Sequence, residues 1–252
     1  MIKKTSILVI FLTIFLGCDS ENAGDCFQKS GEIIQEELQL KNFSLITVFE
    51  GVKLVVKQGV EQQVILETGK NLRNDITVEV LDNRLTIRNE NSCNLVRDFG
   101  LTTLYVTSPN ISEIRSSTGF PIKSDGILSY PDLTLFSESF GDIEAETTDG
   151  EFNITVNNTS VNIVSNGIAF FKVNGATQNL NITFAAGDSR LDAENLMAEN
   201  VNLFHRGSND MLVNPQQALN GSIVSTGNVI SYNTPATVEV EELYKGRLIF
   251  KN

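Results

Sequence analysis

Apolar and polar residues alternate along most of the chain, and between residues 112 and 232 the alternation recurs as a repeat. We take the central apolar residue of each repeated segment as an anchor. The six anchors, separated by 21, 28, 19, 21 and 20 residues, are Ile114, Leu135, Ile163, Ile182, Leu203 and Ile223. No helical window lies between these strand-length segments. A period of about 20 residues is then typical of a β-solenoid, in which each coil buries its apolar edge against the next.

Residues two positions apart in a strand share a face, so the anchors predict further columns of side chains. The column two positions before the anchors is largely apolar. The column two positions after them is mainly serine and consists of Ser116, Ser137, Ser165, Phe184, His205 and Ser225. Two interpretations of the serines remain open. They either face inward at a tight corner, hydrogen-bonded to one another or to the backbone, or they are turn residues that face water.

Shorter alternating segments flank the repeats and predict the two ends of the stack. From Phe43 to Asn89 the pattern predicts a β-meander with turns at 57–59, 69–71 and 81–83. Its expected inward residues are Ile46, Val48, Val52, Leu54, Val64, Leu66, Ile76, Val78, Leu85 and Ile87. The final segment, 234–252, predicts a hairpin with its turn at 244–246. We expect the meander and the hairpin to cap the exposed ends of the solenoid.

The longest interval between anchors separates Leu135 from Ile163. It contains the strand-like segment 151–157 and the acidic residues Glu138, Asp142, Glu144, Glu146, Asp149 and Glu151. We therefore expect one coil with an extra strand. The acidic residues favour a solvated strand face, on which Asp142, Glu144 and Glu146 point together into water. A calcium site or an acid/base pair is the alternative, but no segment has the spacing of a twelve-residue calcium loop.

Residues 1–17 resemble a secretory signal peptide. Lys3 and Lys4 precede an apolar run that ends at Leu16 and is shorter than the roughly 20 residues of a membrane-spanning helix. Gly17 and Cys18 then resemble a bacterial lipoprotein cleavage site, although Phe15 and Leu16 stand where Leu and a small residue are usual. We predict lipid on Cys18, with an unlipidated secreted protein as the alternative. Residues 18–42 would be a tether, and 43–252 a single domain. Within the tether, residues 32–40 favour either a first strand or a short helical turn.

Two cysteines remain after Cys18. In an exported chain, Cys26 and Cys93 favour one disulfide that ties the N-terminal segment to the end of the first β region. Two free buried thiols are the alternative.

The charge balance limits the classes of partner. The 252 residues carry a formal net charge of −12, so the chain has no electrostatic footprint for nucleic acid or for anionic headgroups. Contact with a membrane is therefore expected through the lipid anchor. Asn-x-Ser/Thr triplets such as Asn181-Ile182-Thr183 are typical of strand and turn positions here. Exposed Asn and Thr side chains on successive coils could form a flat polar face for a carbohydrate or a protein partner.

These segments resemble a known family, the head GIN domain of putative auto-transporter adhesins, common as exported lipoproteins in Bacteroidetes. The resemblance lies in the segments 43–59, 78–87 and 101–119 and in the repeated Gly and Asn positions up to Tyr232. It implies a right-handed, single-stranded β-helix-like fold and a role in surface adhesion. It implies no catalytic or binding residues.

The sequence offers little that points to catalysis. His205 is the only histidine, and its position among small polar residues and Phe184 favours a hydrogen-bonded structural imidazole over a metal ligand or a general base. We expect no metal and no cofactor. The sequence therefore predicts a non-enzymatic lipoprotein of the cell envelope, placed in the outer membrane, that binds a surface protein or glycan. A carbohydrate-active enzyme of β-helix type and a structural envelope component are the alternatives.

Overall fold

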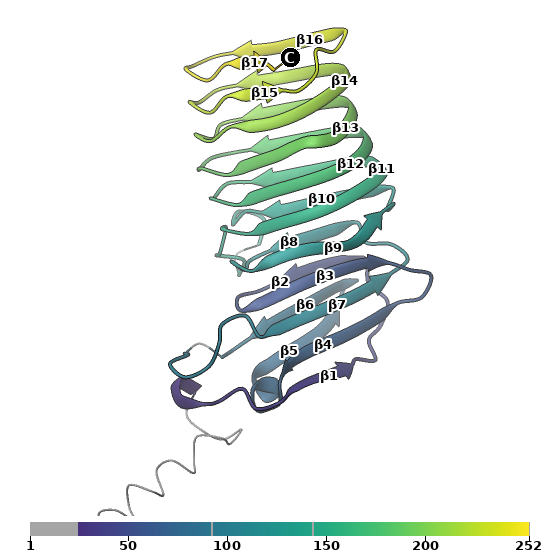
Figure 1. The fold of residues 1–252 in the computed structure, drawn as a ribbon, viewed down its shortest axis with the longest axis vertical. Helices are drawn as coiled ribbons and strands as arrows, with labels where there is room; N and C mark the ends of the chain where they lie inside the picture. The colour runs from purple at the N-terminus through teal and green to yellow at the C-terminus, as the bar shows by residue number, and fades with distance from the viewer. Residues whose placement is uncertain (1–24, 92, 143, 252) are drawn as a thin grey trace, which may run out of the picture.

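The described residues, 58% of them in strands and 4% in helices, form seventeen strands that pair into one strongly curled, open sheet, a half-barrel. The computed structural model describes residues 25–91, 93–142 and 144–251. Figure 1 shows the strands stacked along the long axis, with the first described residues at one end and the C-terminus at the other. The prediction of an all-β fold is confirmed. Within the described residues, no helix has the length and apolar character that crossing a membrane requires.

Four long parallel strands form the upper part of the sheet, and each contributes to two ladders of hydrogen-bonded strands. They are β11 (Glu151–Ser165), β12 (Phe170–Phe184), β13 (Arg190–His205) and β14 (Met211–Ile223). Their first halves continue to β9 (Pro121–Leu128) on one side and β15 (Val229–Ser231) on the other. Their second halves continue to β10 (Asp132–Ser137) and β16 (Thr237–Glu242). We call these rows the first ladder and the second ladder.

The remaining strands extend both ladders toward their ends. The first ladder adds β3 (Val52–Gln58), β7 (Thr102–Ser108), β4 (Gln63–Gly69), β1 (Ile33–Glu37) and, at the C-terminal end, β17 (Leu248–Phe250). The second ladder adds β8 (Glu113–Ser116), β2 (Leu45–Val48), β6 (Arg84–Asn89) and β5 (Ile76–Leu81). Two short 3-10 helices are η1 (Asp25–Phe27) and η2 (Lys70–Asp75).

The register of the second ladder confirms the repeat for five of its six anchors. Leu135 pairs with Ile114 and Ile163, and the row continues through Ile182 to Leu203. The sixth anchor is wrong, because Leu203 pairs with Gly221 and Ile223 pairs with His205. At Gly221 φ is +135°, and a Cβ atom would lie 1.8 Å from the carbonyl oxygen of Leu203. Only glycine fits there, so the anchor position carries no apolar side chain for the sequence pattern to detect.

The predicted serine column faces inward. Ser116, Ser137 and Ser165 are fully buried. The Ser165 hydroxyl donates to the carbonyl oxygen of Ser137 at 3.0 Å and lies 2.7 Å from the hydroxyl oxygen of Ser189. The prediction that these serines face inward is therefore confirmed, and Ser165 forms the expected hydrogen bonds. Ser225 does not belong to the column, because Ile223 occupies that register position.

Aromatic side chains fill the core of the long strands. Phe152 and Phe171 stack with ring centroids 4.8 Å apart, and Phe184 follows at 6.0 Å from Phe171. All three are fully buried. Phe152 lies on β11, whereas Phe171 and Phe184 lie at the two ends of β12, so aromatic contacts join neighbouring coils and also the two halves of one coil.

The predicted N-terminal meander is wrong in its pairing. Among the strands of the described residues, only β5 and β6 form a hairpin between consecutive strands. Their turn, with Asp82 and Asn83 at positive φ, lies at the predicted position 81–83. By contrast, β2 and β3 lie parallel to strands much further along the chain, β8 and β9. The predicted inward residues are nonetheless buried, apart from Val78, which is partly buried. Strand β1 lies inside the segment assigned to the tether, so ordered structure begins before Phe43.

The predicted C-terminal hairpin is also wrong. Strand β16 pairs in parallel with β14, and β17 pairs in parallel with β15. The bend at 244–246 carries the chain from the second ladder to the first instead of reversing it onto itself. Among the described residues, no strand covers the outer edges of β16 and β17. This end of the sheet is therefore open.

The long excursion between anchors is a loop, not an extra strand. Residues 151–157 are the first half of β11, and the inserted residues are 138–150, between β10 and β11. The acidic residues at 138–149 therefore share no strand face, and that prediction is wrong. The β10–β11 register of the second ladder is unbroken next to this loop, whereas the β9–β11 register of the first ladder shifts between Asn153 and Thr155.

Candidate functional site

A column of asparagines runs along the outer face of the second ladder. Directly paired positions on β11, β12, β13 and β14 carry Asn162, Asn181, Asn202 and Asn220. Each amide donates to the side-chain oxygen of the preceding rung, with Nδ2 to Oδ1 distances of 2.9, 3.1 and 3.4 Å along the column. Asn162 donates in turn to the Thr134 hydroxyl at 3.3 Å. We call these four residues the asparagine ladder.

The alternation of β-strands explains why this column exists. Each ladder asparagine precedes a core residue, namely Ile163, Ile182, Leu203 and the core-facing Gly221, so its own side chain points outward. Strands in a sheet lie about 4.7–4.9 Å apart, which lets an amide reach the amide of the next rung. A second column contains Asn179 and Asn200, whose side chains also bond to each other at 3.2 Å.

The surface beside the asparagine ladder is hollowed. A shallow groove of about 270 Å³ is lined by ladder residues Asn181, Asn202 and Asn220, together with Thr183 and Phe204. Phe204 is 39% exposed, whereas Leu203 and His205, its neighbours in the chain, face the core and are buried. The groove thus combines amide and hydroxyl groups with one apolar ring, the combination by which polar pockets orient a ligand.

The asparagine ladder is uncharged along its length. The register places ionisable residues only beyond its ends, where Thr134 pairs with Glu113 and Asn220 pairs with Glu239. Glu113 is neutralised by an ion pair with Arg84 at 2.8 Å. The groove therefore offers hydrogen-bonding groups and an apolar ring but no net charge.

His205 has a structural position. It is fully buried, and its ring lies edge-on to Phe184 with centroids 6.0 Å apart. The Gly207 N–H donates to Nδ1 at 3.3 Å. Burial lowers the pKa of His205, outweighing the opposite effects of a hydrogen bond to the Asn209 backbone and of the Asp210 charge, so the imidazole is neutral at neutral pH. The prediction of a hydrogen-bonded structural imidazole is confirmed.

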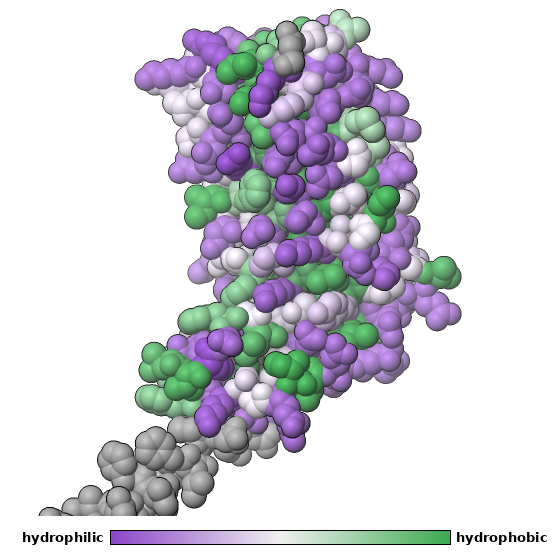
Figure 2. Space-filling model, in the orientation of Figure 1, coloured by the Kyte–Doolittle hydropathy of each residue, from purple (hydrophilic) through white to green (hydrophobic). Residues whose placement is uncertain are grey.

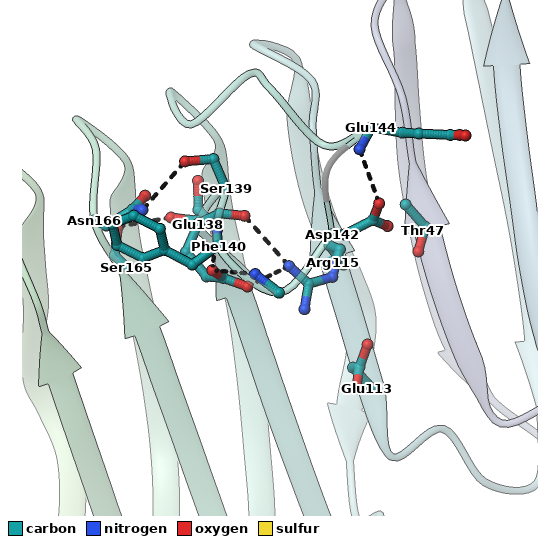
Figure 3. A network of polar contacts seen from close by, with 12 residues as sticks. Thr47, Glu113, Arg115, Glu138, Ser139, Phe140, Asp142, Glu144, Ser165 and Asn166 are labelled. Atoms are coloured by element: carbon teal, nitrogen blue, oxygen red, sulfur yellow. Dashed lines mark hydrogen bonds and ion pairs between the residues drawn. The ribbon is translucent and has the colours of Figure 1, made fainter.

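The acidic residues of the 138–150 loop do not converge on one site. Glu138 turns inward to Arg115, with Oε1 2.5 Å from the guanidinium, while Oε2 accepts the N–H groups of Phe140 and Gly141 (Figure 3). Glu144 instead forms an ion pair with Arg88. Among residues 25–251, leaving out 92 and 143, no three His, Cys, Asp or Glu side chains are grouped to hold a metal ion.

Arg115 and Glu138 form a buried ion pair at the start of the loop. Their side chains are each 8% exposed, and the Arg115 guanidinium also lies 4.5 Å from the centroid of the Phe136 ring. Burial alone raises the pKa of Glu138, but the hydrogen bonds from Arg115, Gly141 and Phe140 outweigh burial and hold the pKa below its usual value. The pair fixes the beginning of the loop and is not available to a ligand.

Two of the three cysteines lie within the described residues. Cys18 lies outside the described residues. Cys26 and Cys93 are joined by a disulfide, with Cα atoms 4.5 Å apart and 67 residues between them in sequence number. Closing a loop of that length stabilises a fold by about 4 kcal/mol in the chain-entropy account.

The sequence pointed to exposed Asn and Thr rungs but not to the continuous ladder. The signal was present, because an asparagine stands immediately before each correctly placed anchor from Ile163 to Leu203. With Ile223 as the sixth anchor, the pattern places Ser222 in the column, whereas the register places Asn220 there. One misplaced anchor therefore hid the last rung.

Comparisons with known proteins identify the family of the chain. The family model described as "putative auto-transporter adhesin, head GIN domain" matches residues 42–235. No curated protein sequence matches the chain.

Solved structures show the same fold at low sequence identity. A putative adhesin from Bacteroides fragilis superposes with a TM-score of 0.78 at 18% identity, covering 88% of this chain and 99% of that one. A putative adhesin from Parabacteroides merdae gives 0.61 at 15% identity, with 89% and 98% covered. A putative lipid binding protein from Parabacteroides distasonis gives 0.59 at 12% identity, with 87% and 97% covered. Since the family model spans more than half of the sequence, the chain belongs to the family of putative auto-transporter adhesins with a head GIN domain.

Proposed function

We propose that this protein is a lipid-anchored adhesin of the cell envelope that binds neutral glycans on the asparagine ladder. The observation that carries the proposal is the regular outward row of Asn162, Asn181, Asn202 and Asn220 beside the groove that contains Phe204. Family membership supports a role in adhesion. The chemistry of the row supports the choice of ligand.

An asparagine amide has two N–H donors and an oxygen that accepts two hydrogen bonds. Inside the ladder each amide uses one donor and one acceptor position on its neighbours, so a further donor and acceptor face solvent on each inner rung. Sugar hydroxyl groups donate and accept side by side, which matches such paired groups. Successive rungs about 4.7–4.9 Å apart then offer the same pair repeatedly along an extended polysaccharide.

Charge favours a neutral polymer over an acidic one. The whole chain has a formal net charge of −12, and the groove holds no cationic side chain among its lining residues. An anionic glycan would be repelled without local compensation. The exposed Phe204 ring supplies an apolar face for the C–H surface of a pyranose ring.

A glycan array followed by titration calorimetry tests this ligand class. We expect the mature protein to bind one or more neutral oligosaccharides. The double variant Asn202→Ala/Phe204→Ala should weaken binding about tenfold or more, because each lost hydrogen bond contributes about 0.5–1.5 kcal/mol and the ring contact is lost as well.

The matched control is Asn153→Ala, which removes an exposed asparagine from the outer face of the first ladder. This control should bind like the wild type. Equal loss in both variants, or an array that selects only sulfated or uronic-acid glycans, would refute the assignment of the asparagine ladder to neutral sugars.

We further infer that the curled sheet is a right-handed solenoid that displays this face at the cell surface. Its support is the parallel register of successive strands about 20 residues apart. Parallel strands of one sheet connect with right-handed crossovers in about 98% of cases.

The anchor in this proposal is a lipid on Cys18, which follows the apolar N-terminal run and Gly17. Palmitate labelling of the expressed chain should mark the wild type and leave Cys18→Ala unlabelled. Equal labelling of the two chains, or none in the wild type, would exclude this anchor and leave an unlipidated exported protein.

A further inference from the structure

Exposed apolar side chains gather at the N-terminal end of the molecule. Phe27, Leu95, Val96 and Phe99 are 56, 68, 48 and 77% exposed. Figure 2 shows apolar side chains clustered at this end, where the described chain begins. We call these four residues the apolar collar. Single exposed apolar residues are ordinary on a protein surface, but several at one end mark a contact surface.

The apolar collar is held in shape by covalent and polar links. Phe27 follows Cys26, whose disulfide to Cys93 joins η1 to the loop that carries the other three residues. The Leu95 N–H donates to the carbonyl oxygen of Cys26 at 3.0 Å. The Arg97 guanidinium donates to the carbonyl oxygens of Gln28 and Cys93 at 3.0 and 2.8 Å. The exposed side chains therefore stand on a braced support.

A groove lies between the two linked segments. It has a volume of about 710 Å³ and is lined by residues 29–32 and 95–98, which include Leu95 and Val96. Lys29 and Arg97 are balanced in the lining by Glu32 and Asp98. The apolar collar thus surrounds a surface with little net charge, unlike the acidic chain as a whole.

The short length of chain between Cys18 and the first described residue indicates which partner can reach this surface. Asp25 is the first described residue, and Cys18 precedes it by seven positions. Seven extended residues span at most about 25 Å. A lipid on Cys18 would hold the apolar collar within that distance of the bilayer surface, at a high effective concentration of lipid. Even a weak apolar contact is populated under these conditions.

We propose that the apolar collar is a membrane-contact surface, which enters the interfacial layer of the bilayer that holds the Cys18 lipid. This inference rests on the proposed lipid anchor. Phe, Leu and Val side chains bind at that layer by burying apolar area about 5–10 Å deep. The net charge of −12 excludes attraction to anionic headgroups as the driving force, so binding should be insensitive to salt. The stack then stands with its C-terminal end away from the membrane.

The absence of Trp from the sequence permits a direct test. Phe99→Trp places a single fluorophore in the apolar collar, and Tyr244→Trp places one at the far end, where Tyr244 is 55% exposed. Each lipidated chain is reconstituted on phosphatidylcholine vesicles that contain brominated acyl chains. We expect blue-shifted emission quenched by about half for Phe99→Trp, since bromine quenches at the depth the apolar collar reaches, and no change for Tyr244→Trp.

A second arm separates the contact from the natural anchor. The chain from residue 18 onward, with Cys18→Ala and an N-terminal histidine tag, is held on nickel-chelating lipid in the same vesicles. Quenching of Phe99→Trp in this arm supports the contact even if Cys18 carries no lipid. Vesicle-bound protein with unquenched Phe99→Trp overturns the proposal in either arm. Quenching that appears only after addition of an envelope protein would assign the apolar collar to a protein partner and likewise overturn it.

Discussion

Replacing Phe171 with alanine is expected to lower the free energy of unfolding by about 3–5 kcal/mol, the range for a large buried aromatic side chain. The Phe171 ring is fully buried between Phe152 and Phe184, with centroids 4.8 and 6.0 Å away. Its removal leaves a cavity between β11 and the two halves of β12. Denaturant unfolding followed by circular dichroism measures the loss.

The neighbouring residue is a matched control. Phe170 lies on the outer side of β12 and is partly exposed. The guanidinium carbon of Arg190 lies 5.8 Å from the centroid of its ring. Phe170→Ala should cost less than about 1.5 kcal/mol, because it opens no internal cavity. Similar losses for Phe170→Ala and Phe171→Ala would show that the aromatic row does not hold the coils together.

Replacing Glu138 with alanine is expected to lower the free energy of unfolding by about 3–5 kcal/mol. The variant leaves the Arg115 guanidinium buried without its carboxylate, and it removes the acceptor for the N–H groups of Phe140 and Gly141. Glu144→Ala is the control. Its partner Arg88 is 35% exposed and Glu144 is 69% exposed, so the loss should stay below about 1 kcal/mol.

The same pair predicts a pH dependence. The pKa of Glu138 is lower in the folded state than its ordinary value of 4.5, so ionised Glu138 stabilises the fold above that pH. The contribution is lost as the pH falls from 4.5 through the folded-state pKa. Plots of unfolding free energy against pH for the wild type and Glu138→Ala should therefore converge in acid. Parallel plots would contradict the role of the buried ion pair.

Much of the central stack could be predicted from sequence, because its signal is local. Alternation within each strand identifies inward residues such as Ile163 and Ile182, and short connections keep successive strands adjacent. The prediction failed at Gly221, where the backbone conformation, not an apolar side chain, determines the residue. A search for apolar side chains cannot find an anchor position at which the backbone allows only glycine.

The two ends and the polar loop could not be predicted for a different reason. Strand β2 pairs with β8 and β3 pairs with β9, although these strands lie far apart in the sequence. The alternation of apolar and polar residues within a strand does not indicate which distant strand it pairs with. Neighbouring strands therefore suggested a meander and a hairpin. In the sequence, Glu138 is one of several acidic residues, and nothing there indicates that it forms an ion pair with Arg115 in the fold. The asparagine ladder was only partly visible, because its continuity depends on register.

The open edges of β16 and β17 bear on how molecules of this kind change in length. Each coil contacts mainly the coils directly before and after it, so a duplicated segment of about 20 residues could be added behind β14 without repacking the earlier ones. Such a duplication would lengthen the outer asparagine row by one rung. Reach and ligand length could therefore evolve together by tandem duplication, while the disulfide-braced base stays the same.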